Sequence, residues 1–110
     1  MRDATPIEID VSRLQEMRSA GVSHRVLDVR EPWETELCAL DGSLKIPMRQ
    51  VPARVAELPS EEFIVVICHH GQRSLQVATW LRSQGLEGAA SLAGGIDAWA
   101  RECDPAISRY

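Results

Sequence analysis

The sequence predicts an α/β fold, a three-layer sandwich in which about five mostly parallel strands carry helices on both faces. Short apolar runs alternate with helical patterns along its 110 residues, which is typical of strand–helix–strand units. The run at 63–67 is apolar at every position, as in buried strands of parallel sheets. Apolar residues make up 45% and charged residues 25% of the chain, as in ordinary folded domains. We therefore expect one domain over residues 1–110, with an irregular tail at 102–110.

The amino-terminal half contains three of these strands, each a brief run of Ile, Val or Leu. Asp10 can cap a helix, and Gly21 can end that helix. Pro32 and Pro52 suit the first turn of a helix, where the N–H that proline lacks would find no partner in the helix. In chain order, the expected elements are a strand at 7–9, a helix between Asp10 and Gly21, a strand at 26–29, a short helix at 33–37, a strand at 44–46 and a helix between Pro52 and Pro59.

The carboxyl-terminal half is organised around the strand at 63–67. Beyond it, Val77, Ala78 and Leu81 fall on one face of a helix that Gly85 can end. In chain order, the expected elements are the strand at 63–67, a helix at 75–84, a strand at 89–92, a turn at Gly94-Gly95 and a short helix at 96–101. This alternation implies parallel strands joined by right-handed crossovers.

Charge and cysteine content exclude several functions and locations. The net charge is −4 and the basic residues are scattered, so we expect no nucleic-acid partner. No apolar run approaches the roughly 18 residues of a membrane span, so we expect no membrane partner. The three cysteines lack metal-site spacing, and acidic residues interrupt any leader-like apolar run near the start. These features favour the reducing cytoplasm over a secreted, disulfide-bonded protein.

The candidate nucleophile is Cys68, which follows the strand at 63–67 and precedes a helix. In open α/β sheets this position is the ligand crevice. Amides at a helix amino terminus favour an anion there, and the thiolate is the nucleophilic form of cysteine. We expect the amides of residues 69–73 to surround this sulfur in the open. The predicted site is the nucleophile Cys68 with the loop residues His69, His70, Gly71 (tight turn), Gln72, Arg73 (permanent charge) and Ser74 (helix cap or hydroxyl donor).

Two further groups have simpler interpretations than catalysis. Asp28 and Arg30 stand at a strand end near the crevice, where they could support the site, although a structural ion pair or loop hydrogen bonds is the favoured role. Zinc bound by Cys68, His69 and His70 is disfavoured, because adjacent residues rarely supply three ligands to one tetrahedral ion. We therefore expect no metal.

Three motifs in the right order resemble those of the rhodanese (thiosulfate sulfurtransferase-like) family, and the resemblance covers nearly the whole chain. Residues 68–74, CHHGQRS, resemble the family loop C-x-x-G-x-R-[ST]. Residues 27–34, LDVREPWE, are similar to its D-V-R-x-x-x-E segment, and residues 92–99, LAGGIDAW, to its L-x-G-G-x-x-x-W signature. One departure lies at 40–45, where the histidine of the family's G-H-I-x-G-A segment is missing.

The resemblance implies a rhodanese-like fold and a single-domain sulfurtransferase of the EC 2.8.1 class that needs no cofactor. The Cys68 thiolate would take sulfane sulfur from thiosulfate or a persulfide donor. The resulting Cys68 persulfide would pass the sulfur to cyanide, a thiol or a protein acceptor.

Two other functions stay open at the level of sequence. The domain could be a sulfur-carrying or sensing partner for another protein, because no appended substrate domain is present. A phosphatase or arsenate reductase would also use a Cys…Arg loop. Four residues separate Cys68 from Arg73, whereas protein tyrosine phosphatases have five, and the shorter loop favours sulfur over a phosphoryl group.

Overall fold

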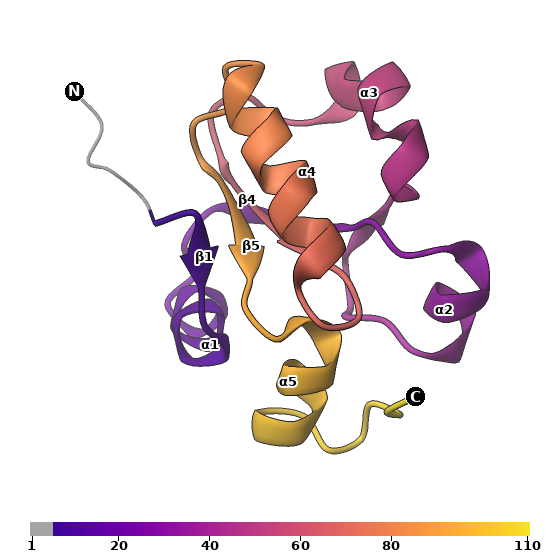
Figure 1. The fold of residues 1–110 in the computed structure, drawn as a ribbon. Helices are drawn as coiled ribbons and strands as arrows, with labels where there is room; N and C mark the ends of the chain where they lie inside the picture. The colour runs from indigo at the N-terminus through magenta and orange to yellow at the C-terminus, as the bar shows by residue number, and fades with distance from the viewer. Residues whose placement is uncertain (1–5) are drawn as a thin grey trace.

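Five strands form one fully parallel sheet in the computed structural model, which describes residues 6–110 (Figure 1). The strands are β1 (Glu8–Ile9), β2 (His24–Asp28), β3 (Leu44–Lys45), β4 (Phe63–Ile67) and β5 (Ala89–Leu92). Their order across the sheet is β1-β5-β4-β2-β3, so β4 pairs with β2 on one side and with β5 on the other. The predicted α/β sheet is confirmed, and every pairing in it is parallel.

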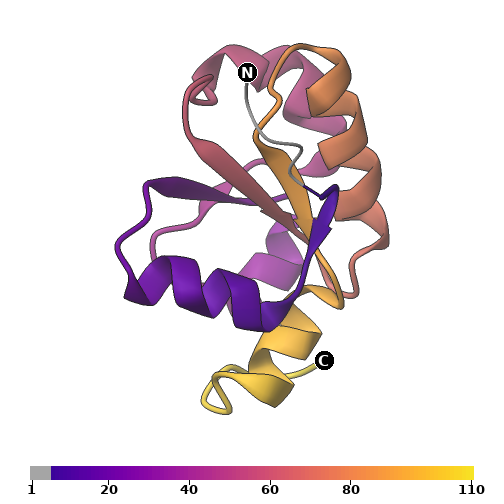
Figure 2. The same cartoon turned by 90° about the vertical axis from the view of Figure 1, so that its left-hand side faces the viewer.

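Helices cover both faces of the sheet, which makes the predicted three layers (Figures 1 and 2). On one face, α1 (Val11–Ser19) and α5 (Gly95–Glu102) pack together. On the other face lie α3 (Val51–Arg54) and α4 (Gln72–Ser83), and α2 (Pro32–Leu37) follows the end of β2. Among residues 6–110, no helix has the length and apolar character needed to cross a membrane.

Strand β4 is buried from both sides, which explains its unbroken apolar sequence. Ile64 and Val66 join the core cluster that includes α4, and Val65 and Ile67 join the cluster that includes α1 and α5. Successive side chains of a strand point to opposite faces, so a strand between two helical layers needs apolar residues at every position. The sheet thereby brings the carboxyl ends of β2, β4 and β5 to one edge.

The helix predicted between Pro52 and Pro59 is shorter than expected. Only α3 is α-helical, and it lies between two 3-10 turns, Met48–Gln50 and Val55–Glu57. The Leu58 amide bonds the Val55 carbonyl three residues back, which tightens the last turn. Val51 and Leu58 are nevertheless buried, so the apolar positions face the core although the backbone is not one helix.

The start of α4 and the end of α5 also differ from the prediction. Helix α4 begins at Gln72 rather than at residue 75, because Gly71 adopts a left-handed conformation with φ of 104° and acts as the N-cap. Helix α5 extends through Glu102, one residue into the predicted tail. Residues 103–110 form no helix or strand, as predicted for the rest of that segment.

Candidate active site

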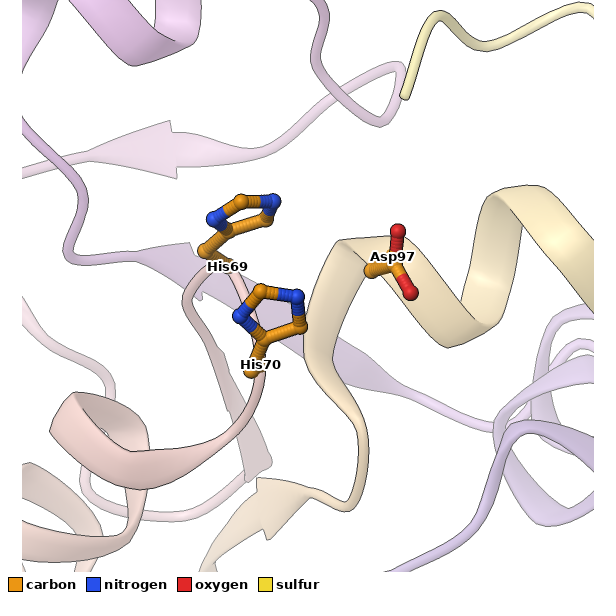
Figure 3. Close-up of side chains that lie close together, drawn as sticks. All are labelled: His69, His70 and Asp97. Carbon is orange, nitrogen blue, oxygen red and sulfur yellow. The ribbon is translucent and has the colours of Figure 1, made fainter. Parts of the chain in front are cut away.

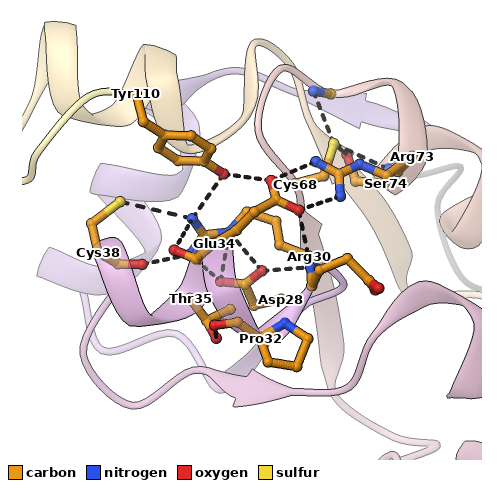
Figure 4. Close-up of polar contacts among 12 residues, drawn as sticks. Asp28, Arg30, Pro32, Glu34, Thr35, Cys38, Cys68, Arg73, Ser74 and Tyr110 are labelled. Atoms are coloured by element: carbon orange, nitrogen blue, oxygen red, sulfur yellow. Dashed lines mark hydrogen bonds and ion pairs between the residues drawn. The ribbon is translucent and has the colours of Figure 1, made fainter.

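The loop after β4 holds the sulfur of Cys68 against two main-chain amides (Figure 4). The Gly71 amide donates to Sγ at 3.0 Å and the Ser74 amide at 3.3 Å. The Ser74 hydroxyl oxygen lies 3.3 Å from the same sulfur. Because Ser74 is in the first turn of α4, its amide has no carbonyl to bind within the helix and is available to the sulfur.

Helix α5 orients this loop through its main chain. The Ile96 amide donates to the Cys68 carbonyl at 2.8 Å, and the Asp97 amide donates to the His69 carbonyl at 3.1 Å. Both carbonyls therefore point toward α5 and away from the sulfur. The close approach needs Gly95, since a Cβ there would clash with the carbonyl oxygens of Cys68 and His69.

The loop differs from the prediction in three respects. Within residues 69–73 only the Gly71 amide donates to Sγ, and the second amide comes from Ser74. Of the two roles predicted for Ser74, helix cap or hydroxyl donor, the cap is excluded because Gly71 occupies that position. The sulfur is not in the open, because Cys68 is only 1% exposed where the loop folds against α5.

Arg73 adds a positive charge to the loop, but its hydrogen bonds go to Glu34 of α2. The two side chains form a bidentate pair at 2.7 and 2.8 Å. The Arg73 hydrogen bonds lower the pKa of the buried Glu34 to about 2, and bonds from Tyr110 and from the Glu31 amide act in the same direction. The pairing with Glu34 raises the pKa of Arg73, with a smaller contribution from Cys68. Glu34 belongs to the D-V-R-x-x-x-E segment, but the sequence does not reveal its partner.

Asp28 and Arg30 form the predicted structural ion pair. Their side chains are fully buried, and Arg30 Nη2 lies 2.7 Å from Asp28 Oδ2. The Arg30 guanidinium also donates to the carbonyl oxygen of Cys38 at 2.7 Å and to the phenol oxygen of Tyr110 at 3.1 Å. Complete pairing of this kind is what allows two charges to be buried.

Tyr110 brings the tail into the site, an arrangement that no local sequence pattern indicates. Its phenol donates to Glu34 Oε2 at 2.6 Å and accepts from Arg30, so it links the two ion pairs. Its ring stacks on that of His69, with centroids 3.8 Å apart and planes 7° apart. Burial, above all, raises the pKa of Tyr110 to about 12, so the phenol stays protonated and can donate.

His69, His70 and Asp97 gather at the outer side of the loop (Figure 3), with potential ligand atoms within 4.8 Å of one another. The two imidazole rings stack at a centroid distance of 3.8 Å with planes 28° apart. The Asp97 carboxylate already accepts from Arg101 at 3.0 Å and from Arg109 at 2.9 Å. This arrangement suits stacking and ion pairing better than metal binding. Gln72 is exposed.

Known proteins share both the sequence and the architecture of this chain. The model of the rhodanese-like domain family matches residues 10–102. A sulfurtransferase from Allochromatium vinosum is 33% identical over 101 residues, which cover 92% of this chain and 94% of that protein. The rhodanese-like/PpiC domain-containing protein 12, chloroplastic, of Arabidopsis thaliana is 40% identical over 78% of this chain, which spans only 30% of that protein. The crystal structure of a rhodanese-related protein from Thermoplasma volcanium gives a TM-score of 0.80 at 31% identity, covering 87% of this chain and 92% of that one.

Replacing Gly95 by alanine tests the contact between the loop and α5. We expect Gly95→Ala to lower the free energy of unfolding by about 3 kcal/mol or more, because the methyl group clashes with two loop carbonyls. Gly42→Ala is the matched control, since Gly42 also has a positive φ but no atom lies within 4 Å of the place that its methyl group would take. That control should cost only about 1–2 kcal/mol of backbone strain. Urea unfolding measures both, and equal losses would contradict the role assigned to Gly95.

Replacing Glu34 by glutamine tests the ion pair with Arg73 through its pH dependence. The pKa of Glu34 falls from its ordinary 4.5 to about 2 on folding, so ionised Glu34 stabilises the folded state at pH values above 4.5. That stabilisation, on the order of 3 kcal/mol, is lost as the pH falls through about 2. The difference in unfolding free energy between wild type and Glu34→Gln should therefore shrink between pH 4.5 and 2.

The exposed Arg54–Glu57 pair supplies the control for that experiment. Glu57→Gln should change the unfolding free energy by less than about 1 kcal/mol at every pH, because exposed pairs contribute little. A Glu34→Gln difference as small as that of Glu57→Gln would mean that the buried carboxylate adds no stability.

Proposed function

The chain belongs to the rhodanese-like domain family, and from that premise we propose that it transfers sulfane sulfur through a persulfide on Cys68. The observation that carries the proposal is the pair of amides, from Gly71 and Ser74, that donate to Sγ of Cys68 at the start of α4. Amides placed in this way stabilise a negative sulfur, and a thiolate is the form that attacks. The sulfurtransferase from Allochromatium vinosum, similar over most of both chains, supports sulfur transfer in general.

In the first half-reaction, the Cys68 thiolate attacks the outer sulfur of a donor such as thiosulfate. The bond between the two sulfur atoms of the donor breaks, and sulfite leaves with the electron pair. Cys68 then carries a persulfide whose terminal sulfur is negative. The amides of Gln72 and Arg73, which are in the first turn of α4 and have no intrahelical acceptor, are the donors that we assign to this terminal sulfur.

In the second half-reaction, a nucleophilic acceptor takes the terminal sulfur. Cyanide or a thiolate attacks it, the S–S bond to Cys68 breaks, and the Cys68 thiolate leaves with the electron pair. The amides of Gly71 and Ser74 stabilise the Cys68 thiolate in both half-reactions, first as the nucleophile and then as the leaving group. The reaction is therefore of the ping-pong type, and it needs no oxidant or metal. A reducing compartment such as the cytoplasm suits a mechanism that depends on a thiolate.

Phosphoryl transfer fits this geometry less well. An arginine that serves a phosphoryl group directs its fork of N–H donors at the phosphate oxygens. Here the two terminal nitrogens of Arg73 both bind Glu34. Hydrolysis of an aryl phosphate well above background would overturn this preference.

Replacing Cys68 by serine tests the assigned nucleophile. We expect thiocyanate formation from thiosulfate and cyanide to fall by about 10³-fold or more, because a hydroxyl is a far weaker nucleophile at neutral pH. Intact-mass measurement after incubation with thiosulfate should detect one added sulfur atom on the wild type and none on Cys68→Ser. Cys103→Ser is the matched control, since Cys103 lies at the end of α5, and it should behave as the wild type. Activity that survives Cys68→Ser would remove the nucleophile.

The same measurements separate an enzyme from a sulfur carrier. Repeated turnover with cyanide or a small thiol indicates a sulfurtransferase. A protein that gains one sulfur but releases it only to a protein acceptor would be a carrier, and the proposal would then hold for the persulfide but not for turnover.

A further inference from the structure

Ser91 is a polar residue in a buried strand, and its hydroxyl leads to the active-site sulfur. All four residues of β5 are buried, and Ser91 is 0% exposed. A buried hydroxyl without a hydrogen bond destabilises the folded state, so Ser91 needs a partner. Ser91 Oγ lies 2.7 Å from Ser74 Oγ, which in turn lies 3.3 Å from Sγ of Cys68. Ser91, Ser74 and Cys68, each at most 1% exposed, thus form a row joined by two hydrogen bonds, which we call the hydroxyl row.

The number of hydrogens in this row depends on the state of the sulfur. Each serine hydroxyl has one hydrogen to donate, a thiol has one, and a thiolate has none. With a thiolate there are two hydrogens for two links: Ser91 donates to Ser74, and Ser74 donates to Cys68. With a thiol there are three hydrogens for the same two links, so one of them has no acceptor within the row. The row therefore favours the thiolate.

We propose that Ser91 is a positioning residue that acts through Ser74. By donating to Ser74 Oγ, the Ser91 hydroxyl directs the Ser74 hydrogen at the sulfur of Cys68. As a thiol, Sγ donates to Ser74 Oγ. Once the thiol has lost its proton, the Ser74 hydroxyl donates in return, and Sγ has three donors with the amides of Gly71 and Ser74. The consequence for sulfur transfer rests on the proposed function, whereas the effect on the thiolate does not.

The side chain of Ser91 is hydrogen-bonded to Ser74 and, among residues 6–110, to none of the charged groups around the loop, so we expect those groups to stay in place when Ser91 is changed. Strand β5 itself, Ala89–Leu92, contains no titratable side chain. The titratable and charged groups nearest the loop are Arg73 on α4, Asp97 on α5, Glu34 on α2, the Asp28–Arg30 pair after β2, His69 and His70 in the loop, and Tyr110 in the tail. A change in the titration of Cys68 in a Ser91 variant is therefore assigned to the hydroxyl row.

The pH dependence of Cys68 alkylation tests the proposal on the full chain. Iodoacetamide modifies the thiolate, and mass spectrometry of the peptide that contains Cys68 gives its rate separately from the other cysteines. Because Cys68 is only 1% exposed, the absolute rate also depends on opening of the loop, so the midpoint of the pH dependence is the quantity compared. We expect Ser91→Ala to move the midpoint of the rate–pH profile upward by about 0.5–1 pH unit, the equivalent of one hydrogen bond. Ser91→Thr, which keeps the hydroxyl, should restore the wild-type midpoint. Ser43→Ala is the matched control, because it removes a buried hydroxyl oxygen that has no hydrogen-bond partner among residues 6–110, and it should leave the midpoint unchanged.

A double-mutant cycle tests whether Ser91 acts through Ser74. Ser74→Ala alone should raise the midpoint, and adding Ser91→Ala should raise it no further, since the link is already broken. A full additional shift, or a Ser91→Ala midpoint equal to that of the wild type, would overturn the proposal. Loss of persulfide formation in the wild type itself would overturn the proposed function while leaving the midpoint shift, and the role of Ser91 in it, intact.

Discussion

Two main-chain hydrogen bonds between the active-site loop and α5 determine the geometry on which the rest of the site depends. They run from Ile96 to Cys68 and from Asp97 to His69. Because a trans peptide unit has its carbonyl and N–H on opposite sides, these bonds turn the amides of His69 and His70 away from α5. They thereby hold the backbone that leads into Gly71, whose amide donates to Sγ. Gly71, Gly94 and Gly95 all have positive φ angles, and only glycine adopts these freely. The signature around Gly94 and the signature around Cys68 are therefore two halves of one structure.

The charges around the loop are paired, which determines how a negative sulfur can be stabilised. Arg73 binds Glu34, Arg30 binds Asp28, and the Tyr110 phenol bonds a member of each pair. The donors that reach Sγ are neutral dipoles, the amides of Gly71 and Ser74, and Sγ itself donates to the Ser74 hydroxyl oxygen. Dipoles held by the fold need no reorganisation when charge appears on the sulfur. Arg73 forms no hydrogen bond to Sγ, and its charge acts on the sulfur only from its position near the loop.

The sequence was sufficient for the features that local patterns encode. The apolar run of β4 indicated a strand buried on both faces, and Gly94-Gly95 indicated a turn or close packing. The start of α4 was predicted too late, because a serine ahead of an apolar helical pattern resembles an N-cap. In the structure the left-handed Gly71 is the N-cap, three residues before Ser74. The partners of Glu34 lie 39 residues away at Arg73 and 76 residues away at Tyr110, and such long-range contacts leave no local pattern. The same holds for Ser91, 17 residues from Ser74. The catalytic roles of the loop residues remain predictions.

In the proposed double displacement the same sulfur is nucleophile and then leaving group, and neutral donors suit this dual role. A thiolate becomes a weaker nucleophile as it is more strongly stabilised, although it then leaves more readily. An unpaired guanidinium against Sγ would favour departure at the expense of attack. By holding Arg73 in a bidentate pair, Glu34 moderates that charge, and the amides of Gly71 and Ser74 supply a smaller, fixed stabilisation. The acidic residue beside the loop thus fits the proposed double displacement, in which Cys68 would serve as nucleophile in one half-reaction and as leaving group in the other.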